Sequence, residues 1–141
     1  MKHAVVLSIR GSQHYPEQEP EVIELVTEGV LEYLDGGWNI TYEESDLTGL
    51  DGVTTTFRVE PGQIILSRTG KLRSQMVFRE GECHDSLYQM EFGALLITVC
   101  AKHIEACISE NGGTVELLYS IEIEQSAAGM VEYFLEIRPK V

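Results

Sequence analysis

Hydrophobic and polar residues alternate with a period of two along most of the chain, as in strands that bury one face of a sheet. The run 113–124 shows the pattern most clearly, and Met130–Pro139 repeats it. Similar alternation occupies 3–10, 22–34, 38–45, 53–60, 63–69, 73–80 and 85–92. Turn-forming Gly, Pro, Asn and Asp residues separate these runs at intervals of about 8–12 residues, a spacing that predicts an all-β barrel or sandwich.

Two longer segments fit either a helix or a strand. Glu21–Leu34 carries glutamates at helical spacing, and Gly93–Ser109 precedes Asn111-Gly112, which can end a helix. The β-branched residues in both segments favour strands. We therefore expect a strand with a bulge or bend at Gly29 in the first segment. In the second we expect a long strand that is bent in its middle.

About ten strands in one small sheet leave two long edges exposed unless the sheet closes on itself. We predict that residues 1–141 form a single all-β domain. The predicted architecture is a closed or nearly closed antiparallel barrel of about 8–10 strands, with a β-sandwich as the alternative. A barrel of this size is either filled by its own side chains or holds one small ligand.

The charge of the chain restricts its partners. It has 141 residues with 10 basic and 23 acidic side chains, a formal net charge of −13. Nucleic acids and anionic membranes would repel such a protein, so neither is expected as a partner. No apolar run approaches the ~20 residues of a membrane span. No signal peptide is recognised either, so we expect a cytoplasmic protein.

The acidic residues are unevenly distributed. Twelve of them lie between Glu17 and Glu60, a segment whose single basic residue is Arg58. They predict a strongly acidic surface, which is either a solvated face that aids solubility or a docking site for a basic protein. A homodimer is the other assembly that we consider.

Three cysteines occur without a C-x-x-C motif, and we expect them to be reduced thiols. On a helix, Cys100, His103 and Cys107 would share one face and form half of a metal site. On the strand that we predict, Cys100 faces away from His103 and Cys107. No metal site is therefore expected.

Short motifs along the chain carry a resemblance to a known family. They are Thr41-Tyr-Glu-Glu-Ser45, Leu47–Thr56, Ile65–Gly70, Met76-Val-Phe78, Tyr88 with Phe92-Gly93, and Gly112-Gly113 leading into Leu118-Tyr119. In this order, over roughly residues 3–139, the chain resembles the YwiB-like family of uncharacterised bacterial proteins. That family is similar in fold to the calycins, the barrels of lipocalins and fatty-acid-binding proteins. The resemblance implies a closed barrel in the bacterial cytoplasm and implies neither a reaction nor a ligand. Met90 stands where the family pattern leads us to expect Thr, which removes a hydroxyl group there.

Alternation along three neighbouring strands brings two opposite charges to one rim of the predicted barrel. Glu44 ends the apolar face of 38–45, and Arg68 ends that of 63–69. In an antiparallel meander both lie where 53–60 begins, two strands or about 10 Å apart. Burying either charge alone is costly, so the two must be paired. The pair either closes the mouth of the barrel or leaves Arg68 to bind a ligand carboxylate or phosphate.

The predicted ligand site combines this pair with hydroxyl-bearing residues of the inner face. Its members are Tyr42, Glu44, Thr55, Arg68, Tyr88 and Tyr119. No metal or cofactor is expected in it.

Signatures of catalysis are missing from the sequence. There is no Gly-x-Ser-x-Gly elbow and no Gly-rich phosphate loop. Glu122-Ile-Glu124 begins like the motif of the triphosphate tunnel enzymes but lacks the lysine that follows in them. We assign no catalytic residue and predict a protein that binds a small, partly apolar, anionic ligand inside its barrel. The alternative is an interaction or structural module whose barrel is filled by side chains and whose acidic face docks a partner.

Overall fold

The computed structural model describes residues 2–15, 18–45 and 50–140, without the side chains of 127 and 128. The predicted strands are all present. They are β1 (Lys2–His14), β2 (Glu21–Leu34), β3 (Gly37–Glu43), β4 (Val53–Glu60), β5 (Gln63–Gly70), β6 (Ser74–Phe78), β7 (Cys83–Met90), β8 (Gly93–Ser109), β9 (Gly112–Ile123) and β10 (Ser126–Pro139). Among the described residues no helix has the length and apolar character that a membrane crossing requires.

The strands form one antiparallel sheet that almost closes into a barrel. Their order is β6-β5-β4-β3-β2-β1-β10-β9-β8-β7. Strands that follow each other in sequence are therefore paired, except β6 and β7, and β1 also pairs with β10. β6 and β7 are the two ends of the sheet. In the described chain they meet at one β-bridge, between Arg73, which precedes β6, and Gln89 of β7, with N–O distances of 2.8 and 2.7 Å. The nearly closed barrel predicted from the sequence is confirmed.

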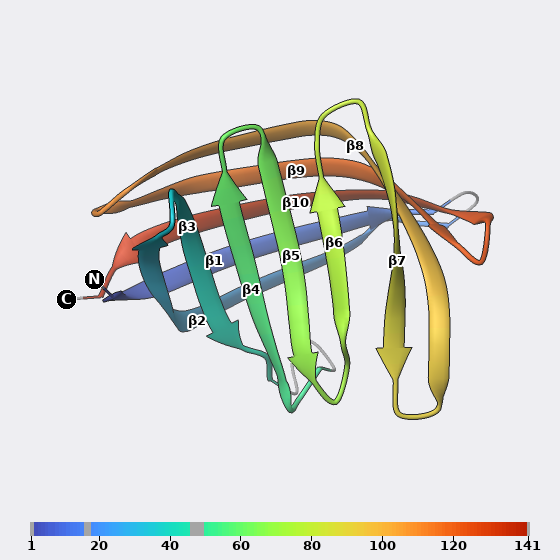
Figure 1. Cartoon of the computed structure of the whole chain (residues 1–141), viewed down its shortest axis with the longest axis horizontal. Helices are drawn as coiled ribbons and strands as arrows, with labels where there is room; N and C mark the ends of the chain where they lie inside the picture. The colour runs from blue at the N-terminus through green and yellow to red at the C-terminus, as the bar shows by residue number, and fades with distance from the viewer. Residues whose placement is uncertain (1, 16–17, 46–49, 141) are drawn as a thin grey trace.

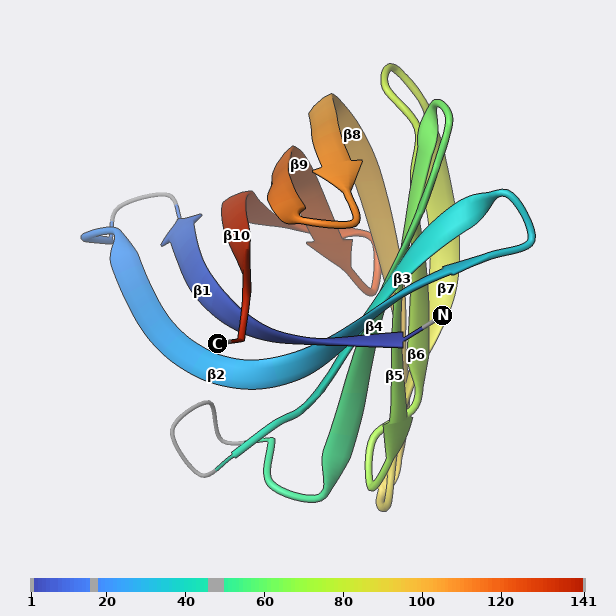
Figure 2. The same cartoon turned by 90° about the vertical axis from the view of Figure 1, so that its left-hand side faces the viewer.

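Two long strands connect the two walls of this barrel. Figure 1 shows β4, β5 and β6 running steeply across β1, β9 and β10. Strand β2 pairs with β1 along most of its length but with β3 only from Val30 to Leu34. Strand β8 pairs with β7 as far as Cys100 and with β9 as far as Ser109. Strands β2 and β8 therefore belong to both walls, which Figure 2 shows from the side.

β2 and β8 are the two strands whose sequences also fitted a helix, and they differ in the regularity of their pairing. The β1–β2 ladder runs through Gly29 without a change of register, so of the bulge or bend expected there the bulge is wrong. Gly29 is instead a point of close approach, because a Cβ atom at this residue would lie 2.7 Å from the Thr41 carbonyl oxygen. In β8, where sequence analysis predicts a bend in the middle of the strand, the register with β9 shifts between Ala101 and His103.

The core follows the alternation that the sequence predicted. Every second residue of β4, from Val53 to Val59, is buried. The largest fully buried side chains are Phe57 and Phe78. Phe78 packs on Tyr119 with ring centroids 4.6 Å apart. Side chains thus fill the middle of the barrel, and any space for a ligand must lie toward its ends.

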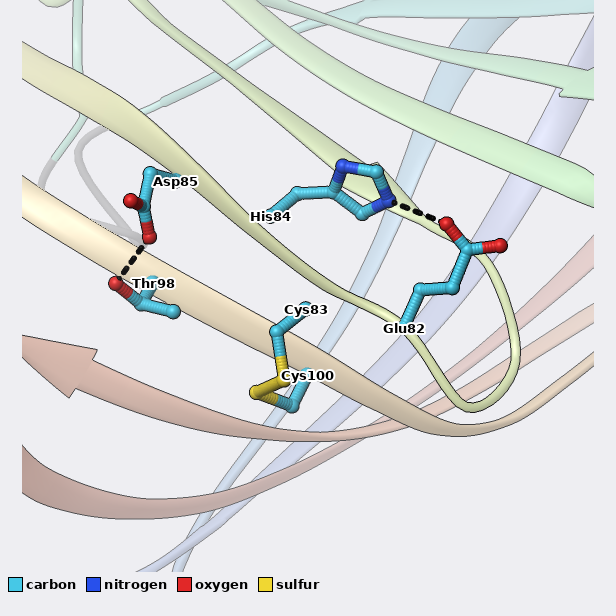
Figure 3. The surroundings of a disulfide bond; sticks show 6 residues. All are labelled: Glu82, Cys83, His84, Asp85, Thr98 and Cys100. Carbon is cyan, nitrogen blue, oxygen red and sulfur yellow. Dashed lines mark hydrogen bonds and ion pairs between the residues drawn. A yellow bond between two sulfur atoms is a disulfide. The ribbon is translucent and has the colours of Figure 1, made fainter.

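The expectation of three reduced cysteines is wrong in this structure. Cys83 and Cys100 form a disulfide between β7 and β8, and only Cys107 is free and exposed. The two bonded residues are directly opposite in the ladder, with Cα atoms 4.0 Å apart (Figure 3). The sequence does not show this pairing because it depends on the register of β7 against β8.

The predicted divergence of Cys100 and His103 is also wrong. The extra residue in β8, at the register shift, restores both residues to the outer face, where they lie opposite Ser120 and Leu118 of β9. A β-bulge changes the inside–outside alternation in this way and re-aims the side chains that follow it. Cys100 still cannot serve as a metal ligand here, because its sulfur is in the disulfide.

Candidate ligand-binding site

The rim predicted from alternation is formed by the ends of β3, β4 and β5. The backbone N–H of Glu44 donates to the carbonyl of Val53 at 2.9 Å, which joins the end of β3 to the start of β4. Thr55 lies opposite Tyr42 on one side and opposite Arg68 on the other. These residues therefore form a row across three strands, with all their side chains on the inner face.

The two charged side chains of the row, Glu44 and Arg68, are both buried but differ in their hydrogen bonds. The Glu44 side chain is 2% exposed and that of Arg68 10%, and Arg68 Nε lies 4.0 Å from Glu44 Oε2. Glu44 accepts a hydrogen bond of 2.6 Å from the Thr55 hydroxyl and another from the Tyr42 hydroxyl. Arg68 Nε, by contrast, is buried without a hydrogen-bond partner among the described residues. The pair is an electrostatic contact that leaves this Arg68 donor unused.

The row opens into a small cavity at this end of the barrel. The cavity has a volume of about 260 Å³, and four of the six predicted residues line it: Tyr42, Glu44, Arg68 and Tyr88. Its other walls are mainly apolar and include Ile9, Ile23, Leu25, Leu50 and Val131. Thr55 and Tyr119 are fully or almost fully buried and do not line it. The structure thus places Thr55 behind Glu44 as a supporting donor and Tyr119 in the core.

A polar opening between β6 and β7 adjoins the cavity. Arg68 lines both spaces, and Ser74 and Ser86 line the opening from the two strands. The hydroxyl oxygens of Ser74 and Ser86 are buried without hydrogen-bond partners in the described part of the chain. Ser74 is the residue directly opposite Arg68 in the β5–β6 ladder. Hydrogen-bond donors without a partner in the described chain, on Arg68, Ser74 and Ser86, therefore lie at the gap between β6 and β7.

The environment keeps Arg68 charged and the buried tyrosines protonated. Burial raises the pKa of Tyr42 far above its usual value, and the charges of Tyr133 and Glu44 raise it further. The pKa of Tyr119 is raised for the same main reason, its burial. Burial alone would lower the pKa of Arg68, but Tyr133, Tyr42 and Glu44 outweigh it and raise the pKa. Near neutral pH Arg68 is therefore a cation, and the Tyr42 hydroxyl stays protonated and can donate to Glu44.

Sequence reasoning missed Tyr133 as a site residue. It lies on β10, lines the cavity, and contacts Phe57 with ring centroids 6.0 Å apart. The alternation of β10 predicts that Tyr133 points inward. Its position beside Arg68, however, depends on the pairing of β1 with β10, which closes the barrel and has no local signal in the sequence.

A larger depression lies at the opposite end of the barrel. It measures about 880 Å³ and is lined by Trp38, Ile64 and Ile104 together with four glutamates and a single arginine, Arg79. It is wide open to solvent and contains no buried charge. We base the candidate site on the smaller cavity, because enclosure and a buried guanidinium are features of a ligand site, whereas volume alone is not.

Fold and cavity together define a calycin-like barrel of ten strands with a small polar recess at one end. The chain belongs to the family described as "Domain of unknown function (DUF1934)", whose profile matches residues 7–137. A relative, the uncharacterized beta-barrel protein YwiB of Bacillus subtilis (strain 168), is 28% identical over 104 residues, 73% of this chain and 71% of the relative. The family resemblance predicted from the sequence is confirmed.

A solved structure shows the same fold. The crystal structure of the ywiB protein from Bacillus subtilis matches with a TM-score of 0.87, over 99% of this chain and 94% of that one. The two sequences are 20% identical in this comparison, so the match establishes the fold alone.

Proposed function

We propose that the protein binds a small, partly apolar anion in the recess formed by Tyr42, Glu44, Arg68 and Tyr88. One observation carries the proposal: a buried guanidinium with an unused N–H, beside the unpaired hydroxyl of Ser74. Buried polar groups in folded proteins nearly always have hydrogen-bond partners, so unpartnered donors call for an acceptor. A carboxylate or phosphate is the acceptor that a guanidinium binds best.

The cavity also limits the size and character of the ligand. At about 260 Å³ it is slightly below the range of about 300–1,000 Å³ that is typical of pockets for drug-sized molecules. Its aliphatic wall accommodates an apolar tail. Glu44 repels a second negative charge next to Arg68, so the ligand is expected to carry a single anionic group.

Thermal melts with a ligand panel test this proposal. Carboxylates from acetate to decanoate, aromatic acids and phosphate monoesters are added singly, and we expect an increase in melting temperature with medium-sized carboxylates. Ligands that bind only the folded state stabilise it by about 2.7 kcal/mol at a concentration of 100 times Kd. The Arg68→Met variant should lose the increase, and Ser74→Ala should reduce it.

The matched control for this experiment is Arg10→Met. Arg10 is an arginine whose side chain is 65% exposed and forms an ion pair of 3.7 Å with Glu24. Its replacement should leave the ligand-induced shift unchanged. A shift of equal size in Arg68→Met and in wild type would contradict the proposal, as would the absence of any shift in wild type.

A second candidate function rests on the free edge of β2. Residues 21–29 pair with β1, whereas β3 joins β2 only from Val30 onward, so within the described chain no strand covers this edge. Val22, Ile23 and Val26 are exposed along it, and Glu21, Glu24 and Glu28 lie on the same segment. An unpaired edge of this kind accepts an extended peptide as an additional strand. The acidic side chains favour a peptide with basic residues.

Binding of a peptide that alternates lysine with valine tests this second candidate. We expect saturable binding that weakens at least several-fold between 50 and 500 mM salt, because screening shortens the reach of the surface charges. Replacing Val26 by proline should abolish it, because proline offers no N–H and disrupts the edge. Binding that is unaffected by both changes would contradict docking at the β2 edge.

For the compartment we propose the cytoplasm, as the sequence suggested. Disulfides are rare there because the thiol pool is kept reduced. In the cytoplasm the Cys83–Cys100 bond of the structure is therefore expected to be reduced and to form on oxidation after cell lysis. Alkylation of thiols in intact cells tests this: modification of all three cysteines supports the cytoplasm, and a protected Cys83–Cys100 pair in the cells contradicts it.

A further inference from the structure

A histidine surrounded by three carboxylates lies on the outer face of the barrel, away from the interior cavity. His103 follows the bulge of β8, Glu105 is two residues further along, and Glu116 projects from β9 directly opposite Glu105. The Nε2 atom of His103 lies 3.4 Å from Glu105 Oε2 and 3.8 Å from Glu116 Oε2. One donor atom from each of the three residues lies within 4.8 Å of the other two.

We propose that His103, Glu105 and Glu116 bind a zinc ion through Nε2 and one carboxylate oxygen each. Zinc lies about 2.0–2.2 Å from such nitrogen and oxygen ligands in a tetrahedral arrangement. Tetrahedral ligand atoms at that distance are roughly 3.4 Å apart, which follows from the same metal–ligand lengths. Both distances from Nε2 are close to this value, so small side-chain movements suffice to form the site.

Glu80 contacts the second ring nitrogen of His103 and orients the imidazole as a metal ligand. Its Oε1 lies 3.3 Å from His103 Nδ1, in position to accept a hydrogen bond from Nδ1–H. A carboxylate on one ring nitrogen leaves the other nitrogen as the lone-pair donor and orients the ring toward the metal. Glu80 comes from the turn between β6 and β7, so a third segment of the barrel supports the site.

The local charge balance favours a divalent cation. Glu105 and Glu116 face each other across two strands, and like charges in that position destabilise a sheet. In the described chain the ion pairs of Glu80, Glu105 and Glu116 are all with His103. A protonated imidazole supplies one positive charge against three negative ones. A zinc ion supplies two and allows the imidazole to remain neutral.

The surroundings leave room for the metal and for a water ligand. The side chains of His103, Glu105 and Glu116 are 48%, 67% and 44% exposed. His103 and Glu116 border a shallow surface depression with Ser12 and Phe134. The site therefore has an entry path and an open fourth position, as in zinc sites with three protein ligands. An imidazole with two carboxylates suits zinc better than calcium or magnesium, which favour sites made of oxygen ligands alone.

The proposal is tested by calorimetric titration of the metal-free protein with Zn²⁺ and, in parallel, by the absorption of Co²⁺ as a spectroscopic probe. We expect one saturable equivalent in wild type. His103→Ala should abolish binding, and Glu116→Gln should weaken it strongly. Glu80→Gln should weaken binding about 10–100-fold without changing the stoichiometry, since it removes only the orienting partner. All of these side chains are on the surface, and circular dichroism checks that each variant is folded.

Two variants serve as matched controls. His84 forms a single pair with Glu82 at 3.3 Å and belongs to no cluster of three donors among the described residues, so His84→Ala should bind zinc as wild type does. Cys107→Ser removes the exposed free thiol and should also leave binding unchanged. Equal affinity in His103→Ala and wild type would overturn the proposal, as would the absence of saturable binding in wild type or loss of binding in either control.

Discussion

Replacing Glu44 by glutamine is expected to lower the free energy of unfolding by about 3–5 kcal/mol, because it leaves the buried Arg68 without a counter-charge. The Glu44 side chain is 2% exposed and the Arg68 side chain 10%, so water cannot compensate for the loss. Chemical unfolding followed by the fluorescence of Trp38, the single tryptophan of the chain, measures the effect.

The same measurement on Arg68→Met is expected to give a smaller loss than Glu44→Gln, because hydrogen bonds to the Glu44 carboxylate partly compensate its buried charge. Glu44 keeps the hydrogen bonds from Thr55 and Tyr42 when the arginine is removed, and methionine fills much of the same volume. The double variant Glu44→Gln with Arg68→Met should recover most of the loss of Glu44→Gln. Equally large losses of unfolding free energy in the two single variants would mean that the Glu44–Arg68 pair has a structural role and that Arg68 is not reserved for a ligand. Small additive losses would mean that neither charge is desolvated.

Removing the Cys83–Cys100 disulfide by the double replacement with alanine is expected to cost about 3 kcal/mol of unfolding free energy. The bond closes a loop of 17 residues, and the entropy model for a loop of about this length gives a value of that size. The bond also joins β7, whose other edge meets the residue before β6 at one bridge in the described chain, to the continuous part of the sheet. Urea unfolding of the variant against oxidised wild type measures the difference.

Cys107→Ala is the control for this second effect, because that thiol is exposed and unbonded. Cys107→Ala should unfold like wild type. A reducing agent should lower the unfolding free energy of Cys107→Ala and of wild type to that of the double alanine variant. Titration of thiols in the native protein, purified without reductant, should find one per chain. Three reactive thiols, or a stability that does not respond to reduction, would contradict the bond.

Local alternation accounts for most of what the sequence predicted correctly. Strand positions, the inner faces of β3, β4 and β5, and the shared rim of Glu44 and Arg68 all follow from a period of two and from hairpin connections. These features need no information about distant parts of the chain. The cavity residues Tyr42 and Arg68 could be identified for that reason.

Features that depend on register or on distant pairing could not be predicted. The bulge after Ala101 reverses the alternation of β8 and places His103 on the outer face, near Glu116. The disulfide requires the register of β7 against β8. Tyr133 reaches the cavity because β10 closes the barrel against β1. Each of these is a consequence of tertiary pairing, for which neighbouring residues provide no signal.

Titration calorimetry with octanoate and octanol, in wild type and Arg68→Met, tests the central claim most directly. The two ligands share their tail and differ in the charged group that Arg68 is proposed to bind. Because a hydrogen bond to a charged group contributes about 1.5–3 kcal/mol, wild type should bind octanoate at least about tenfold more tightly than octanol. Arg68→Met should bind both equally weakly. A preference for octanoate that survives in Arg68→Met, or no preference in wild type, would contradict the assignment of Arg68 as the anion-binding residue.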